Sequence, residues 1–402
     1  MQMTKSKVFI LISKALLCVL VLFGMTSHTP LFAQNGKPNH WYIEPSIRYG
    51  RVIRISPETN YLWNTDLRSV ELRIGKQTDG SHEWEPWFRY PDYGIALRYS
   101  NFNLDMLGDK YAAFGFINGY FVHRPNFALF YQLGAGVCFW TKCYDFYTNH
   151  DNIFVGAHAS AHIDLNFGFT ARMSPHTDFV FRTNFSHSSN GVLKLPNNGI
   201  NGLTFAVGVR GRFAEHIDRI GTMDSLFIPK NSLYFTVSPA VKQSRHEFTT
   251  NRDVKPYYCF ASMLEIGYLR QPSPKFRYGG GLDLFYNREI LTYLPEAERK
   301  PGKCFMQGIF GQFDILYGRM VLHAGVGAYL FRYYDFYQPY YERLGVQFLL
   351  GPKRNHAVGA CIKAHLARAD YIEWSYSYSF YNWYDKKPRK VHVPKKKCPL
   401  NY

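Results

Sequence analysis

The segment FSHSSNGVLKLPNNGIN, residues 185–201, contains residue types that can carry out nucleophilic chemistry. A serine hydroxyl is a poor nucleophile until a base accepts its proton. Residues two apart on a β-strand stand side by side on one face, which would place His187 within reach of Ser189. The loop that follows could supply donors for a developing oxyanion, namely the Asn197 side chain and the Gly191 backbone N–H. This pattern indicates an acyl-transfer site, although Ser, Asn, Gly and Pro are also the ordinary residues of a hairpin loop.

The strand that leads into this segment, TDFVFRTNFSHSS, alternates between two kinds of side chain. Its three phenylalanines share one parity, and the other parity carries Asp178, Arg182, Asn184 and Ser186. In a membrane barrel the phenylalanines would face lipid and the polar residues the lumen. His187 and Ser189 have the phenylalanine parity, so they are predicted to lie on the outer wall, where an enzyme that acts on a lipid needs them. Asn201 shares parity with Leu203 and Phe205 on the next strand and is predicted to open onto the same face.

The composition favours a membrane β-barrel. Aromatic residues make up 18% of the chain, with 31 Tyr and 33 Phe, and Gly is frequent at 32 residues. Past the N-terminal apolar run, no stretch of roughly 18 apolar residues remains that would predict a transmembrane helix. Segments such as GAHASAHIDLNFGF alternate apolar and polar residues over about ten positions, which is typical of barrel strands. A secreted soluble β-protein would have a similar composition, so composition alone does not decide.

The N-terminus has the features of a secretory signal peptide. Lys5 and Lys7 precede an apolar run from about Val8 to Met25, and Ala33 supplies the small residue before a cleavage site. Residues 1–33 are therefore predicted to be removed on export. Six cysteines would remain, without the spacing of a disulfide scaffold or a CxxC pair. Cys138 and Cys143 could form a disulfide in an oxidising compartment, but this disulfide is not expected.

The chain is predicted to contain an internal duplication. YDFY occurs at 144–147 and at 334–337, each time after a Gly/Ala-rich strand, and FRYPDYGIALRYS at 88–100 resembles FRYGGGLDLFYN at 276–287. Two matches in the same order point to a repeat. The predicted fold is all-β: an up-and-down antiparallel transmembrane β-barrel in two tandem copies of about eight strands, over residues 41–213 and 231–384, with 214–230 as a linker. A single barrel of about sixteen strands is the alternative.

The formal net charge of +17 is partly concentrated at the C-terminus, where residues 385–402 hold seven Lys and Arg. Such a segment is usually a solvated, disordered tail. For an exported protein, its charge would attract lipopolysaccharide phosphates or another acidic surface, and nucleic acid is not an expected partner. A surface protein that binds anionic glycans through this tail is a weaker alternative.

The segment HSSNGVLKLPNNGIN resembles the His-x-Ser-Asn signature of the lipid A 3-O-deacylase (PagL) family. Members are eight-stranded outer-membrane barrels that hydrolyse the ester of the 3-O-linked hydroxyacyl chain of lipid A. The resemblance implies His187 as general base, Ser189 as nucleophile, and Asn197 with the Gly191 amide as oxyanion donors. Exported chains of the acyloxyacyl hydrolase group look similar, which leaves a secondary acyl ester open as the bond cleaved.

The resemblance breaks down at Asn201, where the family carries a glutamate that orients the histidine. An asparagine oxygen can still accept the imidazole N–H and hold the tautomer, as in Cys-His-Asn proteases, but it cannot stabilise the imidazolium by charge. Slower catalysis, or help from another carboxylate, would follow.

The second half provides an internal comparison. IKAHLARADYIEWSYSYSF aligns with the signature, with His365 opposite His187, but Ala367 replaces the serine and the asparagine loop is missing. This half is therefore predicted to be a degenerate, non-catalytic repeat.

The leading hypothesis is an outer-membrane serine esterase that removes an acyl chain from lipid A of lipopolysaccharide in a Gram-negative bacterium. No metal or organic cofactor is implied, and a homodimer is left open as an assembly. The alternative is a non-enzymatic outer-membrane barrel, a porin or scaffold, in which HSSNG is only a loop.

Overall fold

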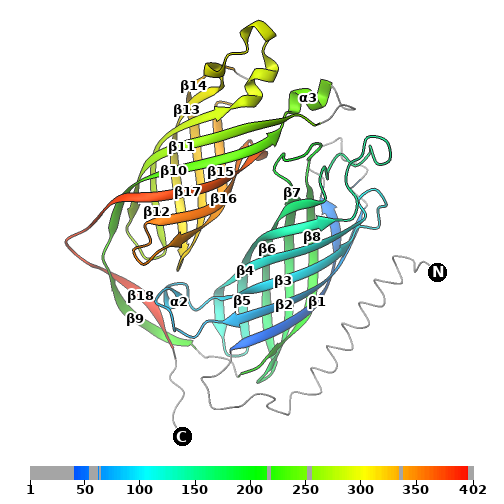
Figure 1. The fold of residues 1–402 in the computed structure, drawn as a ribbon. Coiled ribbons are helices and arrows are strands. Elements are labelled where there is room, and N and C mark those ends of the chain that lie inside the picture. Colours follow the sequence, from blue (N-terminus) through cyan, green and yellow to red (C-terminus); the bar gives the residue numbers. More distant parts are fainter. Residues whose placement is uncertain are drawn as a thin grey trace.

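The computed structural model describes residues 40–53, 62, 65–214, 219–250, 256–334 and 338–396. These residues form two closed antiparallel barrels of eight strands each, together with a separate two-stranded ribbon (Figure 1). The predicted duplicated barrel is confirmed, and the single sixteen-stranded barrel is excluded because each set of eight strands closes on itself. The predicted signal peptide lies outside the described residues. No helix in the described part of the chain is long and apolar enough to cross a membrane.

The first barrel pairs each strand with its neighbour in sequence and closes between its first and last strands. Its strands are β1 (Trp41–Ile53), β2 (Asp66–Gln77), β3 (Asp92–Asn101), β4 (Asp109–Arg124), β5 (Phe127–Trp140), β6 (Ala159–Ser174), β7 (Thr177–Ser189) and β8 (Ile200–Arg212). The short helix α2 (Trp84–Trp87) lies between β2 and β3. Loops 141–158 and 190–199 are long, whereas two-residue turns join β4 to β5 and β6 to β7 at the opposite end. Long loops of bacterial barrels face outward from the cell, and short turns face the periplasm.

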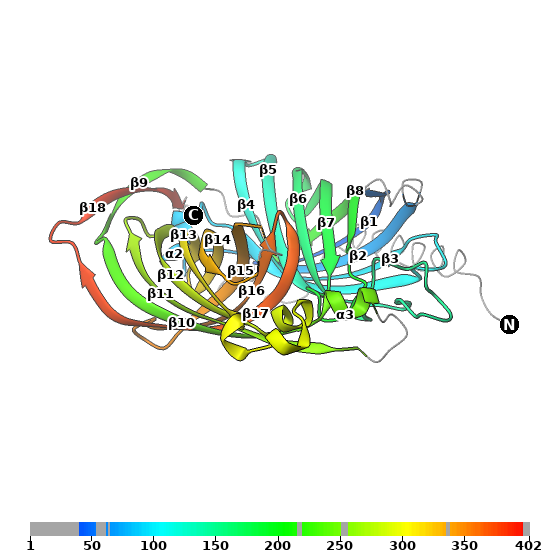
Figure 2. The same ribbon diagram turned by 90° about the horizontal axis from the view of Figure 1, so that it is seen from above.

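The second barrel repeats this plan. Its strands are β10 (Lys230–Gln243), β11 (Tyr258–Gln271), β12 (Phe276–Asn287), β13 (Phe305–Tyr317), β14 (Met320–Arg332), β15 (Tyr340–Leu350), β16 (His356–His365) and β17 (Arg368–Tyr384). Its long-loop end carries α3 (Arg245–Thr250) and three 3₁₀ helices, η2 (Arg288–Tyr293), η3 (Glu296–Glu298) and η4 (Pro301–Cys304). Seen from above, the two cylinders lie side by side (Figure 2).

The alternation of side chains along each strand separates a lipid-facing wall from an interior, as the sequence predicts. In β7 the polar residues from Asp178 to Ser188 at even positions are buried, while Phe179, Phe181 and Phe185 at odd positions are at least partly exposed. Elsewhere on the outer wall, apolar side chains such as Ile95 and Val137 are more than half exposed. Such side chains are stable only against lipid or another apolar surface.

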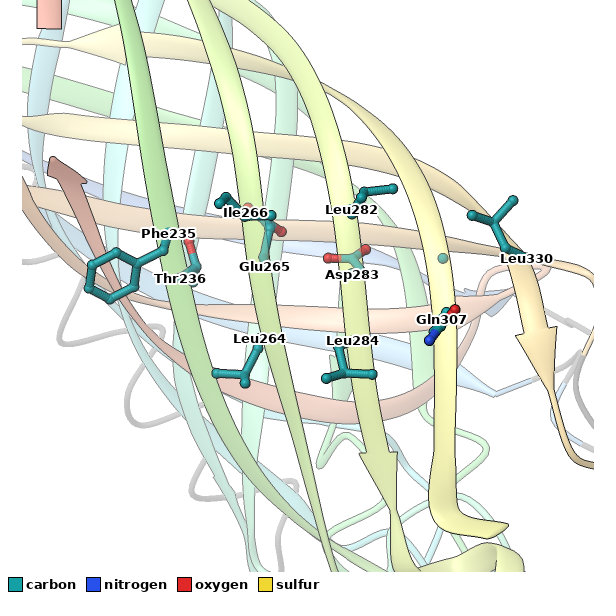
Figure 3. Close-up of a pocket in the computed structure, with 11 residues that line it drawn as sticks. Phe235, Thr236, Leu264, Glu265, Ile266, Leu282, Asp283, Leu284, Gln307 and Leu330 are labelled. Atoms are coloured by element: carbon teal, nitrogen blue, oxygen red, sulfur yellow. The ribbon is translucent and has the colours of Figure 1, made fainter. Parts of the chain in front are cut away.

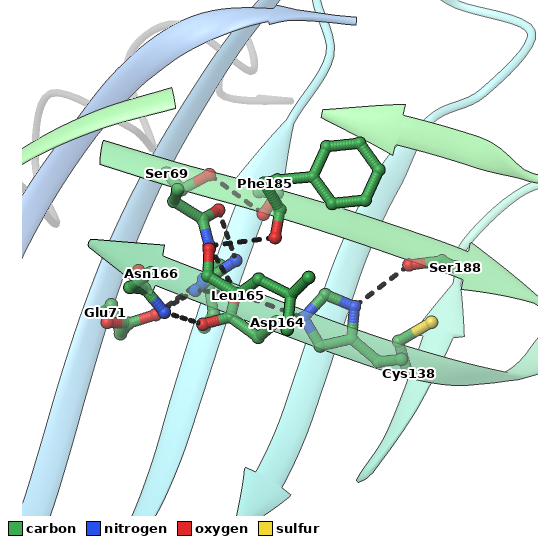
Figure 4. Close-up of polar contacts among 12 residues, drawn as sticks. Ser69, Glu71, Cys138, Asp164, Leu165, Asn166, Phe185 and Ser188 are labelled. Atoms are coloured by element: carbon green, nitrogen blue, oxygen red, sulfur yellow. Dashed lines mark hydrogen bonds and ion pairs between the residues drawn. The ribbon is translucent and has the colours of Figure 1, made fainter. Parts of the chain in front are cut away.

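Buried ion pairs fill the interior of the first barrel. Glu71 lies 2.7 Å from Arg48, 2.5 Å from Arg73 and 2.6 Å from Arg98, and Arg98 also lies 2.6 Å from Asp164. Figure 4 shows Glu71, Asp164 and Asn166 converging within the barrel. The second barrel has a similar centre in Arg343, which pairs with Glu265, Asp283 and Glu373. The interiors are therefore packed with side chains, as expected for narrow barrels.

The repeated sequence segments occupy strands of the same rank in the two barrels. QLGAGVCFW lies on β5 and HAGVGAYLF on β14, each the fifth strand of its barrel. FRYPDYGIALRYS leads through β3 and FRYGGGLDLFYN forms β12, each the third strand. The first YDFY, at 144–147, lies within the 141–158 loop, and residues 335–337 of the second lie outside the described part of the chain.

The segments predicted as a linker and a solvated tail instead contain paired strands. Strand β9 (Arg219–Phe227) lies between the barrels in sequence and pairs antiparallel with β18 (Arg389–Lys396), for example Phe227 with Arg389. Neither strand was predicted from the sequence, because each pairs with a segment more than 150 residues away. Residues 397–402 lie outside the description, and the described cysteines, Cys138 and Cys143 among them, are free thiols.

Candidate functional site

His187 is the last residue of β7 with an outward-facing aromatic or imidazole ring, and it lies near the long-loop end of the first barrel. It lies directly opposite Asn201 of β8 in the strand register, and His187 Nδ1 is 2.6 Å from Asn201 Oδ1. Because an amide oxygen only accepts, the imidazole must carry its proton on Nδ1 to make this bond. The contact therefore leaves Nε2 as the basic nitrogen, which is the tautomer that a general base needs.

Ser189 ends β7 two residues further on, and its hydroxyl is held by the loop. Its side chain lies beneath the 190–199 segment, and the residue is only 6% exposed. Ser189 Oγ accepts hydrogen bonds from Asn197 Nδ2 at 2.8 Å and from the Gly191 backbone N–H at 3.3 Å. Within the described residues no hydrogen bond joins His187 to Ser189. Such bonds are often long in an enzyme without substrate and tighten in the Michaelis complex.

The 190–199 loop has its own internal hydrogen bonds, which aim the Asn197 amide. The backbone N–H of Asn190 donates to Asn197 Oδ1 at 3.1 Å, so that the amide nitrogen points toward Ser189. Asn190 Nδ2 donates to the Lys194 carbonyl at 2.7 Å and closes the loop on itself. The structure places the predicted residues in two hydrogen-bonded groups. His187 pairs with Asn201 across β7 and β8, and Ser189 pairs with Asn197 and the Gly191 amide of the loop.

The 141–158 loop, which belongs to the same barrel, packs against the 190–199 loop. The Gly199 N–H donates to the Phe154 carbonyl at 3.1 Å, and a Cβ on Gly156 would lie 2.3 Å from the Lys194 carbonyl oxygen. Only glycine therefore permits this close approach. Within the same loop, hydrogen bonds from the side chain and backbone of Thr148 hold the pKa of the exposed Asp145 carboxylate below its usual value.

A serine–histidine contact that the sequence did not predict lies inside the barrel, behind His187 and Ser189. His162 Nδ1 lies 3.0 Å from Ser188 Oγ, and His162 Nε2 lies 3.8 Å from Asp164. Lys110 Nζ donates to the same Ser188 oxygen at 3.2 Å. All four side chains lie on the inner face of the barrel and are almost fully buried, so the barrel wall separates them from lipid. This group therefore supports the wall and does not compete with Ser189 as the site.

The second barrel lacks the equivalent site. His365, which aligns with His187, faces the interior of the barrel, where its Nε2 lies 2.9 Å from the Tyr329 hydroxyl. In place of the asparagine loop, a tight turn of Leu366 and Ala367, both with positive φ, joins β16 to β17. This strand end therefore offers neither a nucleophile nor oxyanion donors to the lipid-facing surface.

A hollow of about 510 Å³ lies on the second barrel's wall, away from this site. Leu264, Ile266, Leu282 and Leu284 of neighbouring strands line it, with Glu265 and Asp283 on the same strands (Figure 3). None of the five predicted site residues contributes to it. Across the described residues, no group of three or more His, Cys, Asp or Glu side chains is placed to hold a metal ion.

Comparisons with known proteins match each barrel separately. The family described as lipid A 3-O-deacylase (PagL) matches residues 68–210, and the acyloxyacyl hydrolase C-terminal domain matches residues 231–383. No curated protein matches the chain. Among solved structures, the outer membrane enzyme PagL is 16% identical with a TM-score of 0.28, over 41% of this chain and 97% of PagL. Omp33 of Acinetobacter baumannii is 8% identical with a TM-score of 0.17, over 86% of this chain and all of Omp33.

The two structures are too distant to add to the assignment, which depends on the family matches. Each matched segment lies within one barrel, and together the two segments span well over half of the chain. The chain therefore belongs to the lipid A 3-O-deacylase (PagL) family of outer-membrane β-barrels, with an acyloxyacyl hydrolase C-terminal domain as its second barrel.

Proposed function

We propose that this protein is a serine esterase that hydrolyses an acyl ester of lipid A from the lipid-facing wall of its first barrel. The observation that carries the proposal is the outward-facing His187, fixed by Asn201 in the Nδ1–H tautomer, beside a Ser189 hydroxyl that two loop donors already contact. Lipid A occupies the outer leaflet, and this site lies at the end of the barrel that faces outward in membrane proteins of this type.

In the proposed reaction, Ser189 Oγ attacks the ester carbonyl carbon while His187 Nε2 accepts the hydroxyl proton. The Gly191 N–H and Asn197 Nδ2–H stabilise the negative charge that develops on the carbonyl oxygen. When the tetrahedral intermediate breaks down, His187 returns the proton to the departing alkoxide of lipid A and an acyl-Ser189 ester remains. Water, activated by the same imidazole, then releases the fatty acid and restores the serine.

The packed interiors support this function over that of a porin. The ion pairs around Glu71 and those around Arg343 occupy the space that an aqueous channel would need. The first barrel instead carries His187 on the lipid-facing side of β7, with Ser189 beneath the 190–199 loop at the end of the same strand.

Mass spectrometry of lipid A from Gram-negative cells with and without the protein tests the proposal. Cells that make the protein should yield lipid A lighter by one acyl chain, together with the free fatty acid. The mass lost also identifies which ester is cleaved. Lipid A of unchanged mass, accompanied by ion conductance of the purified protein in planar bilayers, would instead establish a passive barrel.

Asn201 should limit the rate because it orients His187 without adding charge. Replacement Asn201→Glu should raise kcat, since a carboxylate accepts the same Nδ1–H and also stabilises the imidazolium in the transition state. Replacement Asn201→Ala should lower kcat, by less than the about 10⁴-fold that follows when a triad is held in the wrong tautomer. Fatty-acid release from purified lipopolysaccharide measures both. A slower Glu variant would show that another group provides the charge.

A further inference from the structure

The loop that carries the oxyanion donors is attached to the second barrel as well as to the first. Gln243, the last residue of β10, donates its backbone N–H to the Val192 carbonyl at 2.9 Å. Its side-chain Oε1 accepts the Leu195 backbone N–H at 2.7 Å. Gln243 is 4% exposed, so both bonds are shielded from water. One glutamine therefore holds the loop at two points, on either side of Leu193 and Lys194.

The loop segment that Gln243 holds has an unfavourable backbone conformation. Val192 adopts φ of +65° and Gly191 adopts φ of +60°. The left-handed conformation costs a residue with a Cβ about 1–2 kcal/mol, and it is especially unusual for a β-branched side chain. Such strain persists only where the surroundings hold the backbone in place. Val192 is 1% exposed, and its carbonyl is the group that Gln243 binds.

The outer wall of the second barrel also packs directly on Gly191. A Cβ on Gly191 would lie 2.4 Å from Cγ1 of Ile372, so the β17 side chain occupies the space next to the glycine backbone. The Gly191 N–H is one of the two groups that reach Ser189 Oγ. The second barrel thus contacts the loop at the residue that donates to the nucleophile and at the residue after it.

The two barrels also contact each other away from this loop. At the short-turn end the Phe88 and Tyr317 rings have centroids 4.0 Å apart, and the Tyr131 and Tyr317 hydroxyls are 3.3 Å apart. Beyond Gln243, the Arg245 N–H donates to Glu289 at 2.7 Å, which anchors the chain directly after β10.

We propose that the second barrel acts as a positioning scaffold for the first, in which Gln243 and Ile372 hold the 190–199 loop so that Gly191 and Asn197 converge on Ser189. This inference rests on the proposed function, and it gives a role to a barrel that lacks a nucleophile of its own. Gln243 is a positioning residue because it contacts the loop and not the proposed nucleophile or base.

The variant Gln243→Ala tests this role. It removes the acceptor for Leu195 N–H and should lower kcat by about 10²-fold, the loss that a displacement of about 1 Å at a catalytic group produces. KM should change little, because the lipid-facing wall is untouched. Gln243→Glu keeps an acceptor oxygen and should retain most of the activity. Gln271→Ala, at the far end of β11 in the same barrel, is the matched control and should behave like the wild type.

Hydrogen exchange of the Leu195 amide provides a readout that does not depend on catalysis. In folded protein its protection should fall at least tenfold in Gln243→Ala and remain in Gln243→Glu and Gln271→Ala. Unchanged protection, or unchanged kcat in a Gln243→Ala variant that has lost protection, would overturn the positioning role. Inactivity of the wild type would instead sink the proposed function, and the exchange data would still show whether Gln243 holds the loop.

Discussion

Replacing Ser189 by alanine should abolish measurable fatty-acid release from lipid A, since a serine hydrolase that loses its nucleophile loses on the order of 10⁶-fold in kcat. The reason is that Oγ is the atom that forms the acyl bond, and the neighbouring donors cannot replace it. The measurement is release of fatty acid from lipopolysaccharide by purified protein, with Gln243 and Asn201 left intact.

Ser188→Ala is the matched control for this experiment. Ser188 is the adjacent residue and has the same side chain, but it faces inward and contacts His162 and Lys110. Its loss should leave kcat within a few-fold of the wild type. Equal losses in the two variants would point to damage to the strand, and full activity of Ser189→Ala would remove this residue from the mechanism.

Replacing Glu71 by glutamine should destabilise the first barrel by about 3–5 kcal/mol, the usual consequence of removing one partner from a buried ion pair. Arg48, Arg73 and Arg98 surround this carboxylate, and none of them can reach water. Without it, Asp164 would be left to balance most of this positive charge. Urea titration in detergent micelles, followed by the heat-dependent migration of folded barrels on gels, would measure the shift.

An exposed ion pair of the same barrel is the control. Asp105 and Lys142 are 2.7 Å apart, but the Asp105 side chain is 84% exposed. Exposed pairs contribute little to stability. Asp105→Asn should therefore leave the urea midpoint nearly unchanged. If the urea midpoint of Glu71→Gln were also unchanged from the wild type, water would have to enter the barrel and solvate the arginines.

The sequence was sufficient to predict features that depend on local alternation. The parity of His187 and Ser189 with the phenylalanines of β7 predicted an outward direction for both. The alternation of buried and exposed residues holds through His187 because one wall of the strand must meet lipid, whereas Ser189 at the strand end is buried beneath the loop. The same rule separates Ser189 from Ser188, which a motif search alone would not distinguish. Parity predicted that Asn201 shares a face with His187, but their direct opposition in the strand register is seen only in the structure.

Features that depend on contacts between distant segments could not be predicted in this way. Nothing in the composition of the 214–230 segment indicates a strand, because β9 forms only where β18 returns to pair with it. Gln243 was missed for the same reason. A glutamine at a strand end is unremarkable in sequence, and its role follows only from the docking of one barrel against the other.

The ribbon of β9 and β18 has a consequence for the order of assembly. Strand β9 is synthesised before the second barrel and β18 after it, so the ribbon cannot form until all eight intervening strands have left the ribosome. Helix α2 of the first barrel contacts β18, and the Trp87 and Phe227 rings meet at 6.5 Å. Strand β18 can therefore pair with β9 only after both barrels have been synthesised. A prematurely terminated chain would lack this ribbon.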